Sequence, residues 1–406
     1  MTVRKLLPAT AIFALCSSTA AADDAPDPYR FWPGITIAHE VAPGPAPPQN
    51  SAGFSASGEG DTFLQAEATK PDNTTTKGTV YNETNLYGHL NWSDWFTLNG
   101  AVKYEHQRFN NLEDYYPDRT SFMRSEGLTL RQLYATLRPD GTEDFSLYAG
   151  KIHPHFGTAW SYNGGPGIFY NFGTDYEQDE MIGFGADVEI PSTPATSWLG
   201  TAHLSAETFF LDTTALSYSL LGHPPATDMF VDRPGMFALS QGSAANTNNF
   251  DSVTTALQGH DLLGTSGLAY QLSFTHEGVR LPGEKAQTGA TAAAAYTFTL
   301  DDNFTTAPFG EYAWIDNFNG QDGLTRNYGV IGLATIRGKW ELDFVGGLRN
   351  SDDHIANRDV WDYQSNVSLL YQPIDKLWLG GGFNHARIND VGSNTVGLMA
   401  LYQFTL

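Results

Sequence analysis

"TVGLMALYQFTL", residues 395–406, is apolar at every second position and contains no charged side chain. One side of an extended chain would carry Val396, Leu398, Ala400, Tyr402, Phe404 and Leu406, and the other Gly397, Met399, Leu401, Gln403 and Thr405. This period of two predicts a β-strand. A soluble sheet would have to pack the oilier side on a core and protect the apolar terminal strand from aggregation. The pattern therefore favours a strand whose oilier side contacts lipid.

The same alternation recurs along the chain. It is clear in "FTLNGAVKYEHQ" (96–107), "MIGFGADVEI" (181–190), "LAYQLSFTHE" (268–277), "AAAAYTFTL" (292–300) and "WELDFVGGLR" (340–349). We expect about 16 strands of about 10 to 14 residues, enough to close a barrel around an aqueous lumen. No apolar stretch after residue 22 is long enough for a membrane-spanning helix. The predicted fold is an all-β, transmembrane, antiparallel up-and-down β-barrel.

A soluble β-sandwich shows similar alternation, and two further patterns favour the barrel. Short turns on one side and longer loops on the other are typical of outer-membrane barrels, and aromatic rings gather where such barrels meet the membrane interface. Short connections are expected near residues 92–94, 139–143, 191–197, 301–303, 338–339 and 373–376, and longer loops near 109–126, 153–179, 213–249 and 351–358. The aromatic residues at the short-turn side are Trp92, Trp95, Trp198, Phe298, Trp340, Tyr371, Trp378 and Phe404.

The first residues predict export. Arg4 and Lys5 precede the apolar "LLPATAIFALC", and the small residues Ala20 and Ala22 offer a cleavage site. Residues 1–22 are therefore predicted to be a cleaved signal peptide. The Pro-rich residues 23–52 are predicted to be a leader without regular structure, and residues 53–406 to form the barrel. Removal of the signal would also remove Cys16, the one cysteine of the chain.

Charge excludes one class of partner. The chain has 22 basic and 45 acidic residues, and loss of Arg4 and Lys5 would leave 20 basic residues and a net charge of −25. A surface with this excess of negative charge repels the phosphates of nucleic acids. We expect no nucleic-acid partner.

The alternation and the aromatic-ended last strand resemble those of Gram-negative outer-membrane porins. "LYAGKIHPHFGTAW" (147–160) is similar to the Gly-basic…Pro-x-Phe-Gly segment of the phosphate-selective porins and the siderophore-porin group, where it leads from a strand into a long loop. The usual final Phe is Leu406 here, with Phe404 on the same face. The resemblance implies location in the outer membrane, contact with its lipid and lipopolysaccharide, insertion by the barrel-assembly machinery, small hydrophilic solutes as partners and, as one option, a homotrimer.

The charged residues on the polar face predict the sign of the ions that enter. The pore-lining set is Lys103, Glu105, Asp187, Glu189, Glu207, Glu277, Glu341, Asp343, Arg349 and Asp362. Eight acids against two bases favour cations, unless these groups merely pair with neighbours and solvate the wall. A phosphate filter would need clustered Lys and Arg, which these strands lack.

Residues 153–179 are long enough to fold into the lumen and narrow it, although an exposed surface loop is an equal alternative, and residues 213–249 are a rival constriction. His153 and His155 lie in the first of these segments, but two histidines without a third ligand do not define a metal site. We expect neither a metal site nor a cofactor.

Other functional classes have less support. His203 and Ser205 are spaced like the His-x-Ser of outer-membrane phospholipases, but Ala206 and Glu207 replace the Asn-Gly that follows there. We therefore expect a non-enzymatic porin for passive diffusion of small hydrophilic solutes, with cations preferred. The alternatives are a selective uptake channel for a siderophore or another ligand, a barrel hydrolase, and a structural or adhesive barrel.

Overall fold

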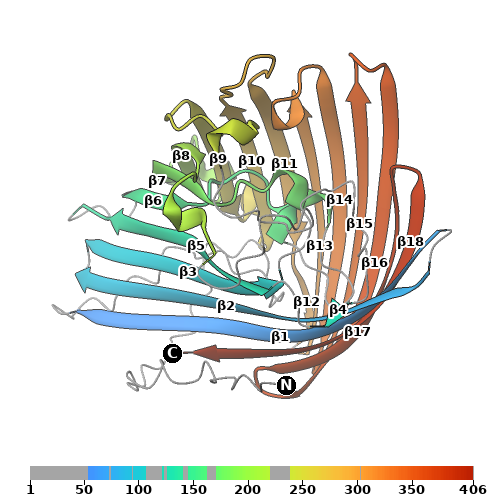
Figure 1. Ribbon diagram of the computed structural model, residues 1–406. Coiled ribbons are helices and arrows are strands. Elements are labelled where there is room, and N and C mark those ends of the chain that lie inside the picture. The colour runs from blue at the N-terminus through green and yellow to red at the C-terminus, as the bar shows by residue number, and fades with distance from the viewer. Residues whose placement is uncertain are drawn as a thin grey trace, which may run out of the picture.

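The computed structural model describes residues 54–72, 75–93, 95–106, 121–122, 126–139, 145–161, 171–219, 238–301 and 303–405. The predicted signal peptide and leader lie outside these residues. The described part is almost entirely β-structure (Figure 1). Its helices are 3-10 helices of three to five residues, and none within the described ranges is long and apolar enough to cross a membrane.

Eighteen strands form one sheet. They are β1 (Ser55–Pro71), β2 (Lys77–Ser93), β3 (Phe96–His106), β4 (Ser121–Phe122), β5 (Glu126–Leu137), β6 (Phe145–Ile152), β7 (Met181–Ile190), β8 (Thr201–Leu211), β9 (Ser252–His260), β10 (Leu268–Glu277), β11 (Gln287–Tyr296), β12 (Phe298–Asp301), β13 (Phe304–Asp316), β14 (Leu324–Arg337), β15 (Trp340–Asp353), β16 (Arg358–Ile374), β17 (Leu377–Ile388) and β18 (Val391–Thr405). The 3-10 helices in the connections are η2 (Ala159–Ser161), η3 (Phe172–Tyr176), η4 (Ser197–Leu199), η5 (Ala215–Ser217), η6 (Leu239–Gln241), η7 (Leu262–Gly264) and η8 (Phe318–Gly320).

The sheet closes on itself as a barrel. Each strand of the wall pairs antiparallel with the next along the chain, and β18 pairs with β1. β11 and β12 both pair with β13 and are successive parts of one wall strand, whereas the two-residue β4 pairs parallel with β2. The wall therefore has sixteen antiparallel strands, which confirms the predicted fold and strand number.

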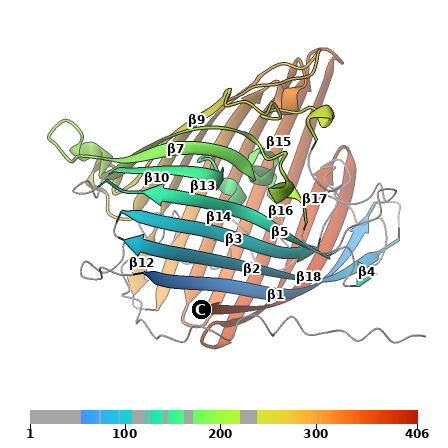
Figure 2. The same cartoon turned by 60° about the vertical axis from the view of Figure 1, so that its left-hand side comes forward.

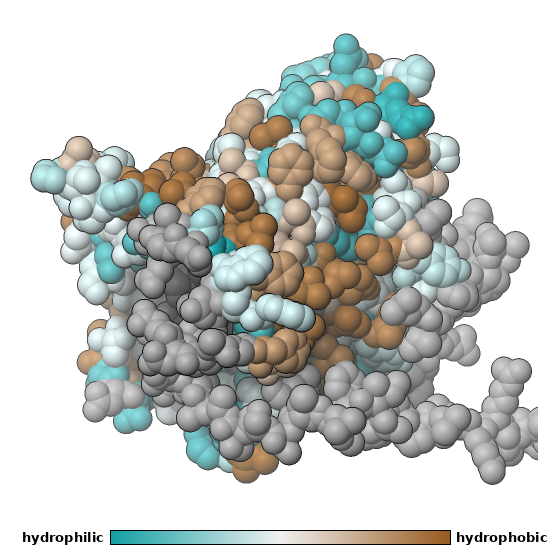
Figure 3. All heavy atoms as spheres, turned by 90° about the vertical axis from the view of Figure 1, so that its left-hand side faces the viewer, coloured by the Kyte–Doolittle hydropathy of each residue, from teal (hydrophilic) through white to brown (hydrophobic). Residues whose placement is uncertain are grey.

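Alternation along each strand places apolar side chains on one face of the wall and polar side chains on the other. Leu64, Phe184, Leu272 and Leu398 are exposed on the outer face, whereas polar residues at the intervening positions, such as Gln65, are buried inside. Brown hydrophobic side chains spread over the outer face shown in Figure 3, with hydrophilic groups at its upper edge. An apolar exterior with a polar interior is the arrangement of a membrane barrel.

The junction of first and last strands depends on a glycine. Gly60 of β1 faces Phe404 of β18, and a Cβ on Gly60 would lie 2.7 Å from the Phe404 ring and 2.6 Å from the carbonyl oxygen of Asn85. Without that atom, the aromatic ring lies directly on the backbone of β1. The terminal strand thus has a partner on each side, β17 and β1, and presents no free edge.

Five of the eight aromatic residues at the short-turn side are exposed, Tyr371 and Phe404 are half-buried, and Trp378 is buried. Trp92, Trp95, Trp198, Phe298 and Trp340 are exposed at strand ends, and Tyr371 packs against Trp340 with 4.6 Å between ring centroids. Trp378 is only 8% exposed, so its assignment to an interfacial girdle was wrong.

Trp378 instead belongs to an apolar cluster inside the barrel with Phe63, Leu370, Met399 and Leu401. The face of the last strand opposite to lipid is therefore packed by side chains here. The sequence pattern places Leu401 on the correct side, but cannot show that neighbouring strands fill the space in front of it.

The connections alternate as expected, except near residues 351–358. β15 continues to Asp353 and β16 begins at Arg358, so this connection is short and the polar residues extend the two strands. Residues 107–120 and 220–237, in two of the other predicted long loops, lie outside the described part. The segment between β6 and β7 is drawn in green inside the ring of strands (Figures 1 and 2).

Candidate functional site: the barrel interior

The connection between β6 and β7 occupies the interior of the barrel. We call residues 153–180 the inner loop, of which 153–161 and 171–180 are described. Phe156 and Ala159 have no exposed surface, and Phe172 and Tyr176 are 3% and 4% exposed. The inner loop packs against the wall residues Ala313, Ile315, Tyr328, Ala386 and Ile388 of β13, β14 and β17. Of the two alternatives left open by the sequence, the structure shows a loop folded inside rather than one exposed at the surface.

Glu311 of β13 attaches the first half of the inner loop to the wall. One carboxylate oxygen accepts the backbone N–H of Thr158 at 2.6 Å and its hydroxyl at 2.8 Å. The other accepts the backbone N–H of Ala159 at 3.2 Å and the hydroxyl of Tyr176. A carboxylate only accepts hydrogen bonds, so all four donors are matched by one buried group.

Asp175 attaches the second half to neighbouring strands. Its Oδ2 accepts from Arg349 Nη1 at 2.8 Å and from the Tyr328 hydroxyl at 3.1 Å, and Arg326 Nη1 lies 3.4 Å away. Arg349 also donates to Asp362 Oδ2 from Nη2 at 2.6 Å and from Nε at 2.9 Å. Arg349, predicted as a pore-lining cation, therefore joins the wall to the inner loop.

A third attachment lies near the return to β7. Gln178 donates from Nε2 to Thr275 Oγ1 at 2.7 Å and to Glu277 Oε1 at 2.9 Å, and its Oε1 accepts from Thr254 at 2.8 Å. Gln287 donates to the same Glu277 oxygen at 2.6 Å. The inner loop is thus bound to β9, β10, β13, β14 and β15 by side chains on their inner faces.

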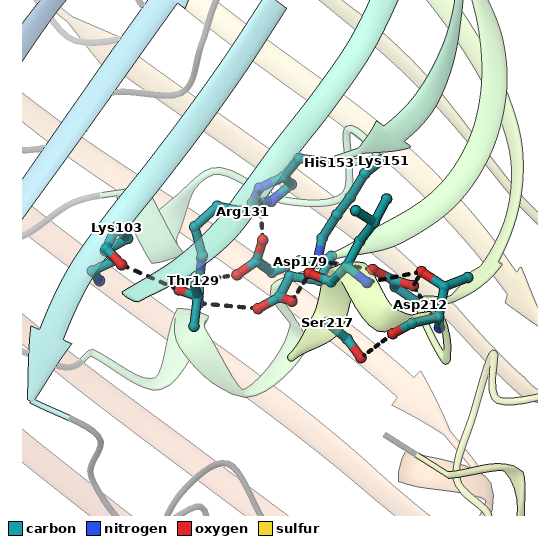
Figure 4. Close-up of polar contacts among 11 residues, drawn as sticks. Lys103, Thr129, Arg131, Lys151, His153, Asp179, Asp212 and Ser217 are labelled. Atoms are coloured by element: carbon teal, nitrogen blue, oxygen red, sulfur yellow. Dashed lines mark hydrogen bonds and ion pairs between the residues drawn. The ribbon is translucent and has the colours of Figure 1, made fainter. Parts of the chain in front are cut away.

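Both ends of the inner loop meet in a cluster of buried charges (Figure 4). Lys151 Nζ lies 2.8 Å from Glu180 Oε2 and 2.9 Å from Asp212 Oδ2, and all three side chains are at most 2% exposed. Arg131 forms ion pairs with Asp179 and Glu180. Lys151 lies opposite the exposed Leu133 of β5 and opposite Ile182 of β7, yet its side chain has no exposed surface.

This charged cluster lies where the pairing between two neighbouring wall strands is short. β5 and β6 pair over only five residues, from Leu133 to Leu137 on β5. Beyond them, Ser219 Oγ accepts the backbone N–H of Leu128 at 3.0 Å and donates to its carbonyl at 3.3 Å. Lys151 also donates to the Leu216 carbonyl at 3.1 Å. Residues 213–219, part of the predicted rival constriction, therefore fill the wall between β5 and β6.

The structure places the predicted pore-lining residues other than Glu105 on the inner face, and most have a partner there. Lys103 Nζ lies 2.8 Å from Glu83. Asp187 Oδ1 lies 3.1 Å from Nδ1 of His203, and Glu189 is opposite His203 in the pairing of β7 with β8. Glu341 and Asp343 are 3% and 1% exposed. Glu105 lies on β3, with its side chain outside the described part.

Glu207 and the two loop histidines have separate contacts. The Glu207 carboxylate accepts from the Tyr148 hydroxyl at 2.7 Å and contacts Nδ1 of His155. His153 stacks on Trp160 with 4.3 Å between ring centroids, and its Nδ1 lies 4.0 Å from Asp179. Within the described ranges, no group of three or more His, Cys, Asp or Glu side chains could hold a metal ion.

His203 and Ser205, the pair considered for a hydrolase, make contacts within the barrel wall. His203 contacts Asp187, and the Ser205 hydroxyl, 1% exposed, donates to the Ala256 carbonyl at 3.5 Å. Sequence reasoning missed Asp175, Glu311, Arg131 and Lys151 as organisers of the interior. For Glu311, the alternation of β13 could have shown its inward position.

Comparisons with known proteins agree with this architecture. No family model matches the chain, and no curated protein matches it. Among solved structures, the outer membrane channel DcaP of Acinetobacter baumannii matches with a TM-score of 0.53 and 15% identity, over 87% of this chain and 99% of that one. Pseudomonas putida OprB matches with a TM-score of 0.56 and 12% identity, over 87% and 94%. An anion-selective porin from Comamonas acidovorans matches with 0.51 and 11% identity, over 86% and 100%. The chain therefore has the fold of outer-membrane channels.

Proposed function

We propose that this chain is an outer-membrane porin, a non-enzymatic channel for passive diffusion of small hydrophilic solutes. The observation that carries the proposal is the inner loop, held inside a closed sixteen-stranded barrel by Glu311 and Asp175. An apolar exterior suits lipid, and a wall of polar and charged side chains suits an aqueous path. A loop fixed inside the barrel narrows that path and excludes large solutes.

The channel is proposed to prefer cations. Inner-face carboxylates include Asp61, Glu83, Asp187, Glu189 and Glu207. Several basic side chains of the described interior are bound to acids: Arg349 to Asp175 and Asp362, Arg131 and Lys151 to the charged cluster, and Lys103 to Glu83. Excess negative charge in a narrow path of low-dielectric walls concentrates cations. Because the same fold serves an anion-selective porin, selectivity has to be argued from these side chains.

The more specific alternative is a channel for selective uptake of a siderophore or another ligand. It predicts saturable uptake of one solute class. Passive diffusion instead predicts rates that fall with solute size and rise linearly with concentration. Swelling of liposomes containing the purified protein, in sugars of increasing size, distinguishes these outcomes, and an absence of both swelling and ion conductance would contradict the porin proposal.

A homotrimer in the outer membrane is proposed from a polar patch on the outer face. Near the middle of β1 and β2, the Thr62 hydroxyl lies 2.8 Å from that of Thr84 and accepts from Asn82 Nδ2 at 3.1 Å. These positions alternate with the inner face and lie beside exposed Leu64. Polar side chains at this depth are costly against lipid tails, but suit a contact between protein subunits.

The mass of the detergent-solubilised protein, measured by analytical ultracentrifugation, tests this assembly. Thr62→Leu with Thr84→Leu should shift the protein towards monomer. Tyr312→Phe with Asn327→Leu is the matched control, because it removes a comparable outer-face hydrogen bond of 2.7 Å from β13 and β14. A monomeric wild-type protein would contradict the homotrimer.

A further inference from the structure

Three amide side chains on the inner wall of β16 and β17 lack hydrogen-bond partners among the described residues. Gln364 and Asn366 alternate with the exposed Tyr363 and Val367 of β16, so they face inward, and Asn384 of β17 lies directly opposite Asn366. Both polar side-chain atoms of Gln364 and of Asn366, and the Oδ1 of Asn384, are buried and unpartnered within this part of the chain. The three side chains are 3%, 1% and 4% exposed. We call them the amide row.

Other asparagines of the inner face form hydrogen bonds within the wall. The Asn99 side chain on β3 contacts His89 Nδ1 through its Oδ1 at 2.8 Å and donates from Nδ2 to the Thr136 hydroxyl at 3.0 Å. Asn91 of β2 accepts from the Thr97 hydroxyl at 2.9 Å. Buried amides without partners are unfavourable. The amide row therefore differs from the rest of the wall and indicates a place where a solute binds.

The amide row lies beside the inner loop. Gly347 of β15 is opposite Gln364, and a Cβ on Gly347 would lie 3.3 Å from Gln364 Nε2 and 3.0 Å from the Phe172 ring of the inner loop. On the other side of the row, the inner positions of β17 and β18 include Gly382 and Gly397, which lie opposite each other and carry no side chain. Glycine within a strand often marks the close approach of a ligand. A solute that passes the inner loop would therefore meet both the amides and bare backbone.

The chemistry of the amide row identifies the class of solute. An amide both donates and accepts hydrogen bonds, and so does a hydroxyl group. Gln364 and Asn366 are about 7 Å apart along the strand, and directly opposed residues have Cβ atoms about 5 Å apart, so a solute with several neighbouring hydroxyl groups can contact all three amides. The amides carry no charge, and Asp362, the next inner-face residue of β16, is bound to Arg349. An apolar solute would leave the amides unpartnered.

We propose that the amide row binds a neutral, polyhydroxylated solute, a sugar or a polyol, beside the inner loop. This inference names a substrate class for the proposed porin and rests on that proposal, because the solute reaches the row through the aqueous path. Its hydroxyl groups would take the place of water on the three amides. Binding at a single weak site leaves the diffusion rate linear in concentration until the solute approaches the concentration that half-occupies the row.

The ion current through the purified full-length protein in a planar bilayer, recorded as sucrose is added, tests the amide row. Sucrose bound beside the inner loop should reduce the current saturably. Asn366→Ala with Asn384→Ala should raise the half-saturating sucrose concentration on the order of tenfold, because the hydrogen bonds of two amides are lost. Asn91→Ala with Asn99→Ala is the matched control, because it removes two inner-face amides that are bonded within the wall, and it should keep the wild-type value.

The viscosity of sucrose lowers the current of every variant equally and does not saturate. Gln364→Leu keeps both asparagines and should also raise the half-saturating concentration, which provides a second readout where the double variant folds poorly. Conducting wild-type protein whose current falls only with viscosity would overturn this inference and leave the porin proposal standing, whereas an absence of conductance would contradict both. Equal half-saturation of wild type and the Asn366/Asn384 variant, or an equal change in the control, would also overturn the inference.

Discussion

Arg349 of β15 lies 2.8 Å from Asp175 of η3, although 174 positions separate them in sequence. This ion pair is one of several that hold the inner loop against the far wall, and the same Asp175 oxygen accepts the Tyr328 hydroxyl. The position of the inner loop is therefore set by ion pairs between buried side chains. The width of the proposed aqueous path through the barrel depends on these ion pairs.

Glu311→Gln should release the first half of the inner loop. A Gln amide places an NH₂ group against donors that now meet a carboxylate oxygen, so at least one buried donor loses its acceptor, which costs about 1–3 kcal/mol of unfolding free energy. Single-channel recordings should show a larger and noisier conductance. Glu83→Gln, which removes a wall carboxylate paired with Lys103, is the control: it also changes one inner-face charge, but it should not add this noise. Identical recordings for wild type and Glu311→Gln would contradict this role.

Lys151→Met should destabilise the junction between β5 and β6. Loss of the ammonium leaves Glu180 and Asp212 without this partner in a buried site, and removal of one member of a buried ion pair costs about 3–5 kcal/mol. Adding Asp212→Asn should restore part of the loss, because one of the two opposing charges is removed. Urea unfolding of wild type, Lys151→Met, Asp212→Asn and the double variant gives the coupling free energy between the two residues, and simple additivity would contradict a shared cluster.

Gly60→Ala should weaken closure of the barrel. The added Cβ would meet the Phe404 ring and the Asn85 carbonyl within 2.7 Å, and overpacking of this kind costs about 1–3 kcal/mol. Gly88→Ala on β2 is the matched control, because a Cβ there meets nothing within 4 Å. The fraction of protein that migrates as a folded, heat-modifiable band on electrophoresis should fall for the first variant only.

Ala400→Arg tests the orientation of the last strand. Ala400 shares the outer face with exposed Leu398 and Tyr402, and Arg on the lipid face near the bilayer middle costs about 2–4 kcal/mol. Ala400→Leu changes size without charge and should be tolerated. Equal folding of both variants into lipid vesicles would mean that this face does not contact lipid. Leu401→Arg is not a suitable control, because Leu401 is buried in the apolar cluster with Trp378.

The sequence predicts the barrel wall well because the alternation of apolar and polar residues within each strand shows which side chains face outward and which face inward. Leu398 outward and Asp343 inward follow from alternation alone, and sixteen strands follow from repeating it. The interior was harder to predict. Contacts such as Arg349 with Asp175, or Glu311 with Thr158, join distant segments and leave no local pattern. Trp378 was misleading for the same reason, since side chains of neighbouring strands decide where its ring lies.

The most direct test of the central claim is the reversal potential of the purified protein in a planar bilayer under a KCl gradient. The inner-face carboxylates predict a potential of cation-selective sign that diminishes as salt rises, because charges are screened over about 10 Å at 0.1 M salt. Neutralising Asp187, Glu189, Glu341 and Asp343 together should reduce it further. An open pore with an anion-selective potential would contradict the account.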